Sequence, residues 1–109
     1  MATAVQHRLP VKIVVLNNGF LGMVRQWQEL FYDRCYSHTE MEVVPDFIKL
    51  AEAYGALGLR ATRPEEVEPV LRKGLSHPGL VIMDFVVEKE ECVYPIVPAG
   101  APITDMLLV

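Results

Sequence analysis

The residues best suited to hold a ligand lie in the turn after the first apolar run. The turn reads Asn-Asn-Gly-Phe-Leu-Gly over residues 17–22 and follows the run Val-Lys-Ile-Val-Val-Leu at residues 11–16. Asparagine side chains offer the oxygen ligands that a hard cation such as Mg²⁺ prefers. Glycines let a ligand come close to the backbone, and the N–H groups that open a following helix favour a phosphate. The same composition is typical of an ordinary turn, so a binding site and a plain turn both stay open.

Beyond this turn, apolar side chains recur at three- and four-residue spacing, which predicts a helix over residues 20–32 with one apolar face. Such a face, when it carries methionine and aromatic residues, is usually part of a core. The same side chains can also form the wall of a ligand channel, so both interpretations stay open. The members of the face are Phe20, Met23, Val24, Trp27, Leu30 and Phe31.

The order of elements predicts an α/β fold, in which a parallel sheet is flanked by helices. Runs rich in β-branched residues at 11–16 and 80–87 have the composition of strands buried on both faces of such a sheet, and a short strand fits residues 57–61. Parallel strands joined in this order require right-handed crossovers. Helices are expected over residues 2–7, 20–32, 45–54 and 62–75, and residues 88–109 are expected to be mostly irregular, with a helical turn or two at 103–108.

Polar residues within these elements have ordinary structural roles, with one exception. Thr62 is expected to supply the hydroxyl cap of the helix that starts near Pro64. Glu65, Glu66 and the acids at 88–91 are expected to be solvated charge. Asp84 is the exception because it interrupts an apolar strand. We expect it either near the end of that strand or against a partner across an interface.

The overall composition excludes several classes of protein. The chain has 109 residues, a formal charge of −4 and a mean hydropathy of +0.24. Without a basic stripe it is not expected to bind nucleic acid. No apolar run approaches the roughly 20 residues that span a membrane, and the N-terminus lacks the apolar segment of a signal peptide. Because a small domain leaves much of its surface exposed, this apolar content implies a partner or a larger parent domain.

The remaining reactive side chains give no catalytic group. Cys35 and Cys92 are too few for a disulfide framework or a zinc cluster, so we expect free thiols and a reduced, cytoplasmic setting. The histidines are scattered and have no evident partner, so none is expected to act as a base. They are His7, His38 and His77.

Several strings of the sequence resemble the large catalytic subunit of acetolactate synthase (acetohydroxyacid synthase). Val-Val-Leu-Asn-Asn at residues 14–18 is similar to the closing half of the thiamine-diphosphate motif, whose opening half is Gly-Asp-Gly. Gly-Met-Val-Arg-Gln-Trp-Gln at residues 22–28 resembles the string that separates this family from pyruvate oxidases and decarboxylases of the same fold. The match continues through residues 45–55 and 94–108 and covers essentially the whole chain.

The resemblance implies the C-terminal part of a thiamine-diphosphate-binding fold, with an α/β core over residues 1–87 and an irregular tail, or lid, over 88–109. The family reaction decarboxylates pyruvate on thiamine diphosphate and joins the remaining two-carbon unit to pyruvate or 2-ketobutyrate in branched-chain amino-acid biosynthesis. The cofactor is the electron sink, and the protein supplies position and electrostatics.

The resemblance also implies roles for individual residues. Asn18, through its side-chain oxygen, and Phe20, through its backbone carbonyl, would bind the Mg²⁺ that bridges the diphosphate, while Asn17 would anchor the turn. Helix N-terminal amides would meet the diphosphate, and the helix face beyond them would line the channel for the second keto acid and for inhibitors. The amides are those of Leu21, Gly22 and Met23, and the channel residues are Met23, Val24 and Trp27.

Much of the family's machinery is absent from the sequence. The Gly-Asp-Gly half of the motif, the domain with the catalytic glutamate and the domain that holds FAD are missing, so we expect no catalytic residue here and no synthase activity from the isolated chain. The implied partners are the rest of the catalytic subunit and, in the full-length family, a homo-oligomer. Whether a regulatory small subunit also binds is left open by the resemblance. The alternatives are another thiamine-diphosphate enzyme of the pyruvate oxidase or glyoxylate carboligase type, a non-catalytic α/β remnant, or a small module with an unrelated anion-binding loop.

Overall fold

The protein was studied as a computed structural model, which describes residues 1–108. The chain divides into two compact units. The first combines residues 1–19 with 42–88, and the second combines residues 20–41 with the chain from Lys89 onward. The sequence-based division had placed all of residues 1–87 in one core. Here residues 20–41 group with the tail instead, because the helix they contain packs its polar and apolar side chains against tail residues.

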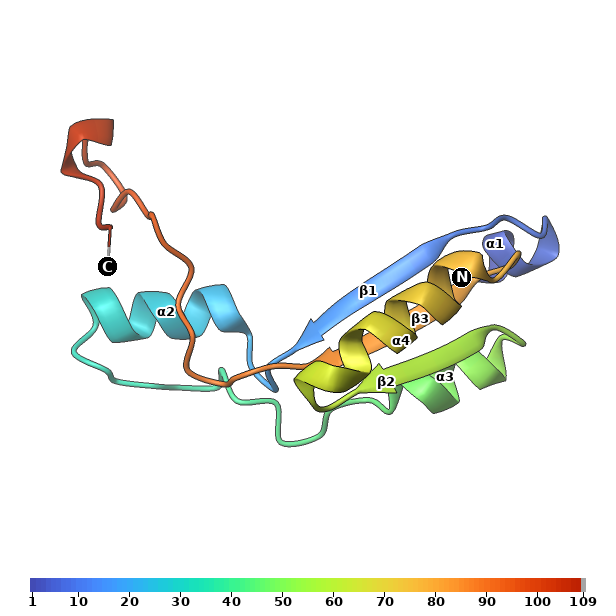
Figure 1. Ribbon diagram of the computed structural model, residues 1–109. Coiled ribbons are helices and arrows are strands. Elements are labelled where there is room, and N and C mark those ends of the chain that lie inside the picture. The colour runs from blue at the N-terminus through green and yellow to red at the C-terminus, as the bar shows by residue number, and fades with distance from the viewer. Residues whose placement is uncertain (109) are drawn as a thin grey trace. The chain divides into compact units, whose positions relative to one another are not determined.

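The first unit is built on a sheet of parallel strands in the order β1-β3-β2 (Figure 1). The strands are β1 (Lys12–Asn17), β2 (Leu57–Ala61) and β3 (Val81–Val86), and the helices of this unit are α1 (Ala2–Gln6), α3 (Phe47–Ala53) and α4 (Pro64–Ser76). The predicted α/β class is therefore confirmed. The observed elements begin and end within one or two residues of the predicted bounds. Helix α3, for example, begins at Phe47 because Asp46 caps it.

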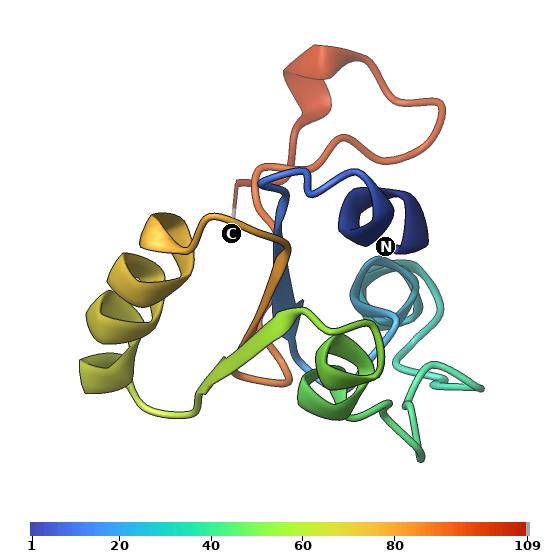
Figure 2. The same ribbon diagram turned by 90° about the vertical axis from the view of Figure 1, so that its right-hand side faces the viewer.

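Helices cover both faces of this sheet (Figure 2). Helix α4 lies on one face, and α3 and α1 lie on the other. On the α4 side, alternate residues of β3 form the buried centre, since successive side chains of a strand point to opposite faces. That core consists of Ala61, Val81, Met83 and Phe85, with Leu57, Leu59, Val70 and Leu71 packed against it.

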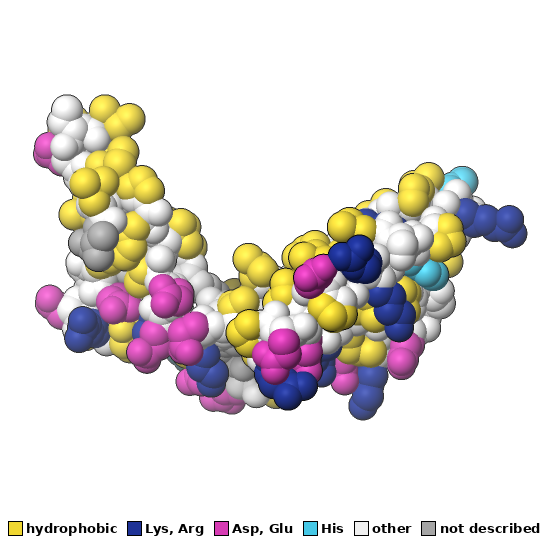
Figure 3. All heavy atoms as spheres, viewed as in Figure 1, with side chains coloured by type: hydrophobic (Ala, Val, Ile, Leu, Met, Phe, Trp, Pro, Cys, Tyr) yellow, Lys and Arg dark blue, Asp and Glu magenta, His cyan; other side chains and the backbone are white. Residues whose placement is uncertain are grey.

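Strand β1 is not buried on both faces as the sequence predicted. It pairs only with β3 and so forms an edge of the sheet, while α4 packs on β2 and β3. As a result, Val14 is 51% exposed and Leu16 is 70% exposed. Hydrophobic atoms accordingly reach the surface over β1 and α4 in Figure 3. The prediction failed because an apolar composition does not distinguish a central strand from an edge strand.

Asp84 sits in the interior of β3, fully buried, and its partner is within the chain. The Nε of Arg60 donates to its Oδ2 at 2.8 Å, and this hydrogen bond, against some desolvation, raises the pKa of Arg60. A second Arg60 nitrogen donates to Asp46 at 3.1 Å. Asp46 in turn accepts from the backbone N–H of Ile48 at 3.0 Å and caps α3. The Asp84 carboxylate is therefore paired with the neighbouring strand through its Oδ2, a partner that the sequence did not indicate.

The start of α4 also differs from the prediction. The N-cap residue is Arg63, not Thr62. Glu66 reaches back and accepts from the backbone N–H groups of Thr62 at 2.8 Å and Arg63 at 3.2 Å. The Thr62 hydroxyl donates to the same carboxylate at 3.1 Å rather than capping the helix. Glu66 is therefore a capping group of the helix and not solvated charge.

These contacts make the stability of the first unit depend on pH through Glu66. The Thr62 backbone N–H, the Arg63 side chain and the Thr62 hydroxyl lower the pKa of Glu66 from 4.5 to about 2. A carboxyl group with a depressed folded-state pKa stabilises the fold above its unfolded pKa and loses that contribution as the pH falls toward the folded value. We expect the difference in urea midpoint between wild type and Glu66→Gln to shrink between pH 4.5 and about 2. Glu65→Gln is the control, and a gap that stays constant over this window would contradict the assignment.

The second unit is organised around one helix, α2 (Gly22–Phe31). It begins two residues later than predicted, because Phe20 forms an antiparallel bridge with Glu40 and Leu21 is the N-cap. The tail is mostly irregular, as expected, with a single 3₁₀ turn at Ile103–Asp105. It is closed on itself by a bridge between Ile96 and Leu107.

Candidate functional site

The turn after β1 is held by its first asparagine. The Asn17 Oδ1 accepts from the Gly19 backbone N–H at 3.3 Å, and the Asn17 carbonyl accepts from the Val87 N–H at 3.1 Å. Gly19 has a φ of +71°, a conformation that glycine adopts without strain. Asn17 therefore anchors the turn, as predicted. Asn18 follows it directly, half-buried, past the carboxyl end of the strand.

The other predicted cofactor residues form the entry to α2. Leu21 is the N-cap and its backbone N–H donates to the Thr39 carbonyl at 2.8 Å. Gly22 and Met23 are the first two residues of the helix, whose first turn has no acidic side chain. Nothing in that turn therefore opposes an anion at the helix N-terminus. Asn18 belongs to the first unit and Phe20 to the second.

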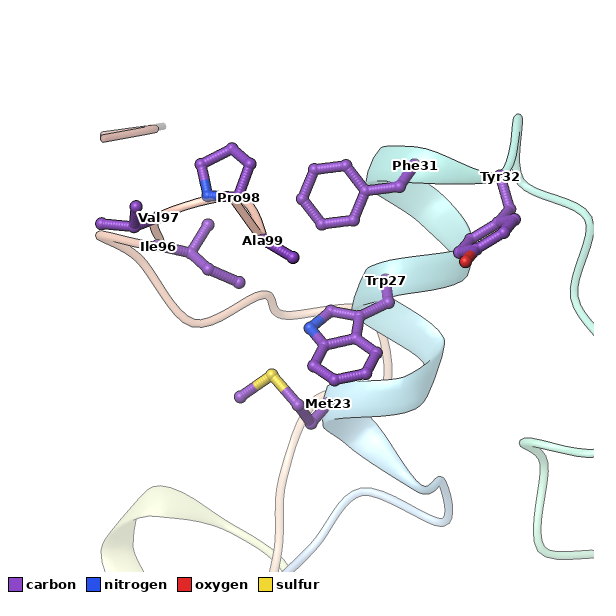
Figure 4. Close-up of a pocket in the computed structure, with 8 residues that line it drawn as sticks. All are labelled: Met23, Trp27, Phe31, Tyr32, Ile96, Val97, Pro98 and Ala99. Atoms are coloured by element: carbon purple, nitrogen blue, oxygen red, sulfur yellow. The ribbon is translucent and has the colours of Figure 1, made fainter. Parts of the chain in front are cut away.

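Helix α2 and the tail enclose an apolar pocket of about 650 Å³ within the second unit. Figure 4 shows Met23, Trp27 and Phe31 projecting from α2 toward residues 96–99 of the tail. Met23 and Trp27 are each 49% exposed, so both remain accessible to a ligand. The residues lining the pocket are Met23, Trp27, Phe31, Tyr32, Ile96, Val97, Pro98 and Ala99.

The structure brings together only part of the predicted channel wall. Met23 and Trp27 share the pocket, whereas Val24 lines a smaller hollow of about 310 Å³ that also includes Trp27 and Cys35. Phe31 and Tyr32 were not predicted as lining residues. Phe31 follows Trp27 by four residues, so the helical period could have indicated it. Tail residues 96–99 have no comparable sequence signal, since their position depends on how the tail folds back.

A buried arginine lies on another face of α2. Arg25 is 6% exposed, and its guanidinium stacks over the rings of Phe20 at 5.4 Å and Tyr36 at 4.9 Å. The Arg25 guanidinium forms ion pairs with the carboxylates of Glu29, at 2.9 Å, and Glu90, at 3.7 Å. Because carboxylates already compensate its charge, Arg25 connects the loop and the tail to the helix rather than offering an anion site. A hollow of about 320 Å³ is lined by Arg25 and by the loop residues 36–40.

The sequence is similar to those of a known protein family. Residues 1–85 match the family described as "Thiamine pyrophosphate enzyme, C-terminal TPP binding domain". The chain belongs to this family. The acetolactate synthase large subunit of Haemophilus influenzae is 44% identical over 99% of the chain, which is 19% of that protein. The mitochondrial acetolactate synthase catalytic subunit of Saccharomyces cerevisiae is 45% identical over 98% of the chain and 15% of its own length. The resemblance to acetolactate synthases is thus confirmed, although the chain spans only about a fifth of these relatives.

A solved structure supports the fold assignment. The thiamine diphosphate-dependent 4-hydroxybenzoylformate decarboxylase of Rhodococcus jostii RHA1 superposes with a TM-score of 0.71 over 83% of this chain and 17% of that chain. Its sequence identity is 24%, so this likeness concerns the fold. Across the described residues 1–108, no helix is long and apolar enough to cross a membrane.

Within residues 1–108 no three His, Cys, Asp or Glu side chains gather to hold a metal ion. The Asn18 side-chain amide and the Phe20 backbone carbonyl both contain neutral oxygen donors. Mg²⁺ accepts donors of this kind when phosphate oxygens supply charge.

The two thiols of the domain are free. Cys35 is exposed, whereas Cys92 is half-buried and its Sγ lies 3.8 Å from the Glu29 carboxylate. Desolvation and the negative charge of Glu29 together raise the pKa of Cys92. A thiol with a raised pKa is mostly protonated at neutral pH and is a poor nucleophile. Cys92 therefore acts as a packing residue beside α2.

Proposed function

We propose that this chain supplies part of the thiamine-diphosphate site of an acetolactate synthase, which joins a two-carbon unit from pyruvate to a second 2-keto acid. The observation that carries the proposal is the pocket on α2, since Trp27 of the family string and Met23 open onto it together. The acetolactate synthase relatives support the choice of reaction. When bound, thiamine diphosphate supplies the electron sink for decarboxylation.

In this proposal the turn and the start of α2 bind the diphosphate end of the cofactor. Asn18 would contribute its side-chain oxygen, and Phe20 its backbone carbonyl, to a Mg²⁺ ion that also needs ligands from the rest of the catalytic subunit. The amides of Gly22 and Met23, at the positive end of the helix, would bind the diphosphate. The Leu21 amide was predicted for the same role, but its bond to Thr39 makes it a support of the helix start.

The pocket between α2 and the tail receives the second substrate in this proposal. Its lining is apolar and aromatic, which suits the short alkyl chain of pyruvate or 2-ketobutyrate. Trp27 and Met23 shape that space from the helix, and residues 96–99 close it as part of the lid. FAD and the catalytic glutamate belong to other parts of a full-length enzyme, and we propose the rest of that subunit, in a homo-oligomer in the cytoplasm, as the chain's partner.

A chimeric enzyme tests this function. The region of the Haemophilus influenzae large subunit that matches this chain is replaced by the chain, and the product formed from pyruvate, thiamine diphosphate, Mg²⁺ and FAD is measured. We expect acetolactate. Asn18→Ala is expected to weaken Mg²⁺-dependent cofactor binding by about 10- to 100-fold or more, the range seen when groups around a metal are removed.

The matched control is Asn17→Ala, which removes the hydrogen bond to Gly19 but leaves the proposed Mg²⁺ ligand. It is expected to weaken cofactor binding less than Asn18→Ala. Equal losses in the two variants would assign Asn18 to the turn only. A chimera that binds the cofactor but forms acetate or another product instead of acetolactate would contradict the proposed reaction.

A further inference from the structure

The tail is joined to α2 at one buried side chain, Gln26. Its Nε2 donates to the Val93 carbonyl at 2.8 Å, and its Oε1 accepts from the Val93 N–H at 2.9 Å. Gln26 is only 2% exposed. Its amide therefore pairs with one tail residue in both directions, as an edge strand pairs with its neighbour. Both polar atoms of the buried Gln26 amide are therefore satisfied by the backbone of Val93.

Two other contacts hold the same stretch of tail, and both are weaker. The ion pair between Arg25 and Glu90 is 3.7 Å long, and the Glu90 side chain is 80% exposed. An exposed pair of this kind contributes little to stability. The thiol of Cys92 lies 3.8 Å from Glu29, and a thiol is a weak hydrogen-bond donor. The Gln26–Val93 pair is thus the strongest of the three attachments.

The pocket wall begins three residues after this attachment. Ile96 bonds to Leu107 in both directions, at 3.0 and 2.8 Å, so residues 96–107 form a closed piece of the tail. Residues 96–99 of that piece face Met23 and Trp27 across the pocket. The point at which the tail is fixed to α2 therefore sets how far this wall stands from the helix.

We propose that Gln26 is the positioning residue of the pocket: its paired hydrogen bonds to Val93 hold residues 96–99 at their distance from Trp27. Gln26 does not line the pocket itself, so it acts through the tail. The assignment of the pocket to a second 2-keto acid rests on the proposed function. The attachment itself rests on the geometry alone, so it can be tested without cofactor or substrate.

The first experiment removes the hydrogen bonds and keeps the shape. Gln26→Met in the 109-residue chain replaces the amide by an apolar group of similar length. Amide exchange is followed by NMR, and we expect the protection of the Val93 N–H to fall by on the order of tenfold, as for the loss of one or two net hydrogen bonds. The amides of Met83 and Phe85 in β3 should keep their protection, which shows that the first unit is folded.

Gln28→Met is the matched control. It is the same substitution two positions along α2, and Gln28 bonds to Ser37 and Thr39 of the loop rather than to the tail. Its effect on Val93 exchange is expected to be less than about twofold, because additivity holds for groups with separate partners. If both variants lower the exchange protection of the Val93 N–H equally, the position of the tail depends on the helix as a whole and the proposal fails.

The second experiment uses Gln26→Glu, a variant whose side chain changes state with pH. A protonated glutamic acid can donate to the Val93 carbonyl and accept from its N–H as glutamine does, whereas the carboxylate can only accept. We therefore expect Val93 protection near the wild-type level below about pH 4, and its loss as the pH rises through the titration of the new side chain. Fluorescence of Trp27, the only tryptophan, should report the same transition.

This pH signature separates positioning from simple packing. Arg25 and Glu29 on α2 and Glu90 on the tail form ion pairs beside this attachment, and all three are present in every variant. The difference between Gln26→Glu and wild type therefore isolates the new carboxyl. The proposal is overturned if, in Gln26→Glu, the exchange protection of the Val93 amide and the emission of Trp27 both follow the wild-type pH profile. Because this test compares the pH profile of Gln26→Glu with that of wild type, its result stands even if Gln26→Met does not fold.

Discussion

Arg60→Met is expected to destabilise the first unit by about 3 kcal/mol, at the lower end of the range for breaking a buried ion pair. The Asp84 carboxylate is fully buried, and its Oδ1 has no hydrogen-bond partner within the described residues. Among the described contacts, the carboxylate has one charge-assisted hydrogen bond, from the Nε of Arg60 at 2.8 Å. The Arg60 side chain is itself 37% exposed. Without Arg60 the charge stays in the centre of the sheet without compensation. Urea unfolding followed by circular dichroism measures the loss.

Arg72→Met is the matched control for this prediction. Arg72 pairs with Glu68 at 2.6 Å, but both side chains are nearly four-fifths exposed, so the same substitution should cost less than about 1 kcal/mol. The double variant Arg60→Met/Asp84→Val should recover most of the stability, because replacing both members of a buried pair by apolar groups is often neutral. Equal losses for Arg60→Met and Arg72→Met would mean that Asp84 does not depend on Arg60.

The elements were predictable because each of them carries its own local pattern. Residues 57–61 form β2 as predicted, and the acid at Asp46 ends the loop before α3. The position of each strand in the sheet was not predictable. β1 and β3 have similar apolar compositions, but β3 lies in the centre and β1 at the edge. That order depends on which strands pair, and pairing is a property of the whole fold rather than of any one segment.

Asp84 shows the same limit for a single residue. Its charge marked it as unusual, but its partner could not be identified from the sequence. Arg60 lies on the strand next to β3 and is opposite Asp84 only in the parallel register of β2 and β3. Once that register is known, the pair follows from the geometry of the sheet, since residues in register on neighbouring strands have adjacent side chains.

The candidate site was predicted where its residues are close in sequence. Met23 and Trp27 lie four positions apart on α2, so the helical period predicts that they share a face, and both line the pocket. Gln26 and Arg25 were missed because polar residues beside an apolar helix stripe are ordinarily exposed to solvent. Here they are 2% and 6% exposed, because tail residues more than 60 positions later cover them. Such contacts become visible only when the tail is in place.

The second large effect is expected where α4 comes closest to the sheet, at Gly74. A Cβ added to this buried glycine would lie 2.3 Å from the Sδ of Met83, which is itself fully buried. Overpacking should therefore cost about 1–3 kcal/mol. After the gain of about 1 kcal/mol in helix propensity, Gly74→Ala is expected to destabilise the first unit by up to about 2 kcal/mol. Lys73→Ala, at the neighbouring exposed position, should change stability by less than about 0.5 kcal/mol.

A double-mutant cycle identifies the cause of this effect. Met83→Ala alone leaves a cavity in the core and should cost about 2–5 kcal/mol. In the double variant, the methyl group at residue 74 can occupy part of the space that the Met83 side chain leaves. The double variant should then be more stable than the sum of the two single effects allows, by about 1 kcal/mol. Strict additivity would mean that Gly74→Ala acts by moving α4 as a whole, because a helix that has already moved away no longer competes with Met83 for the same volume.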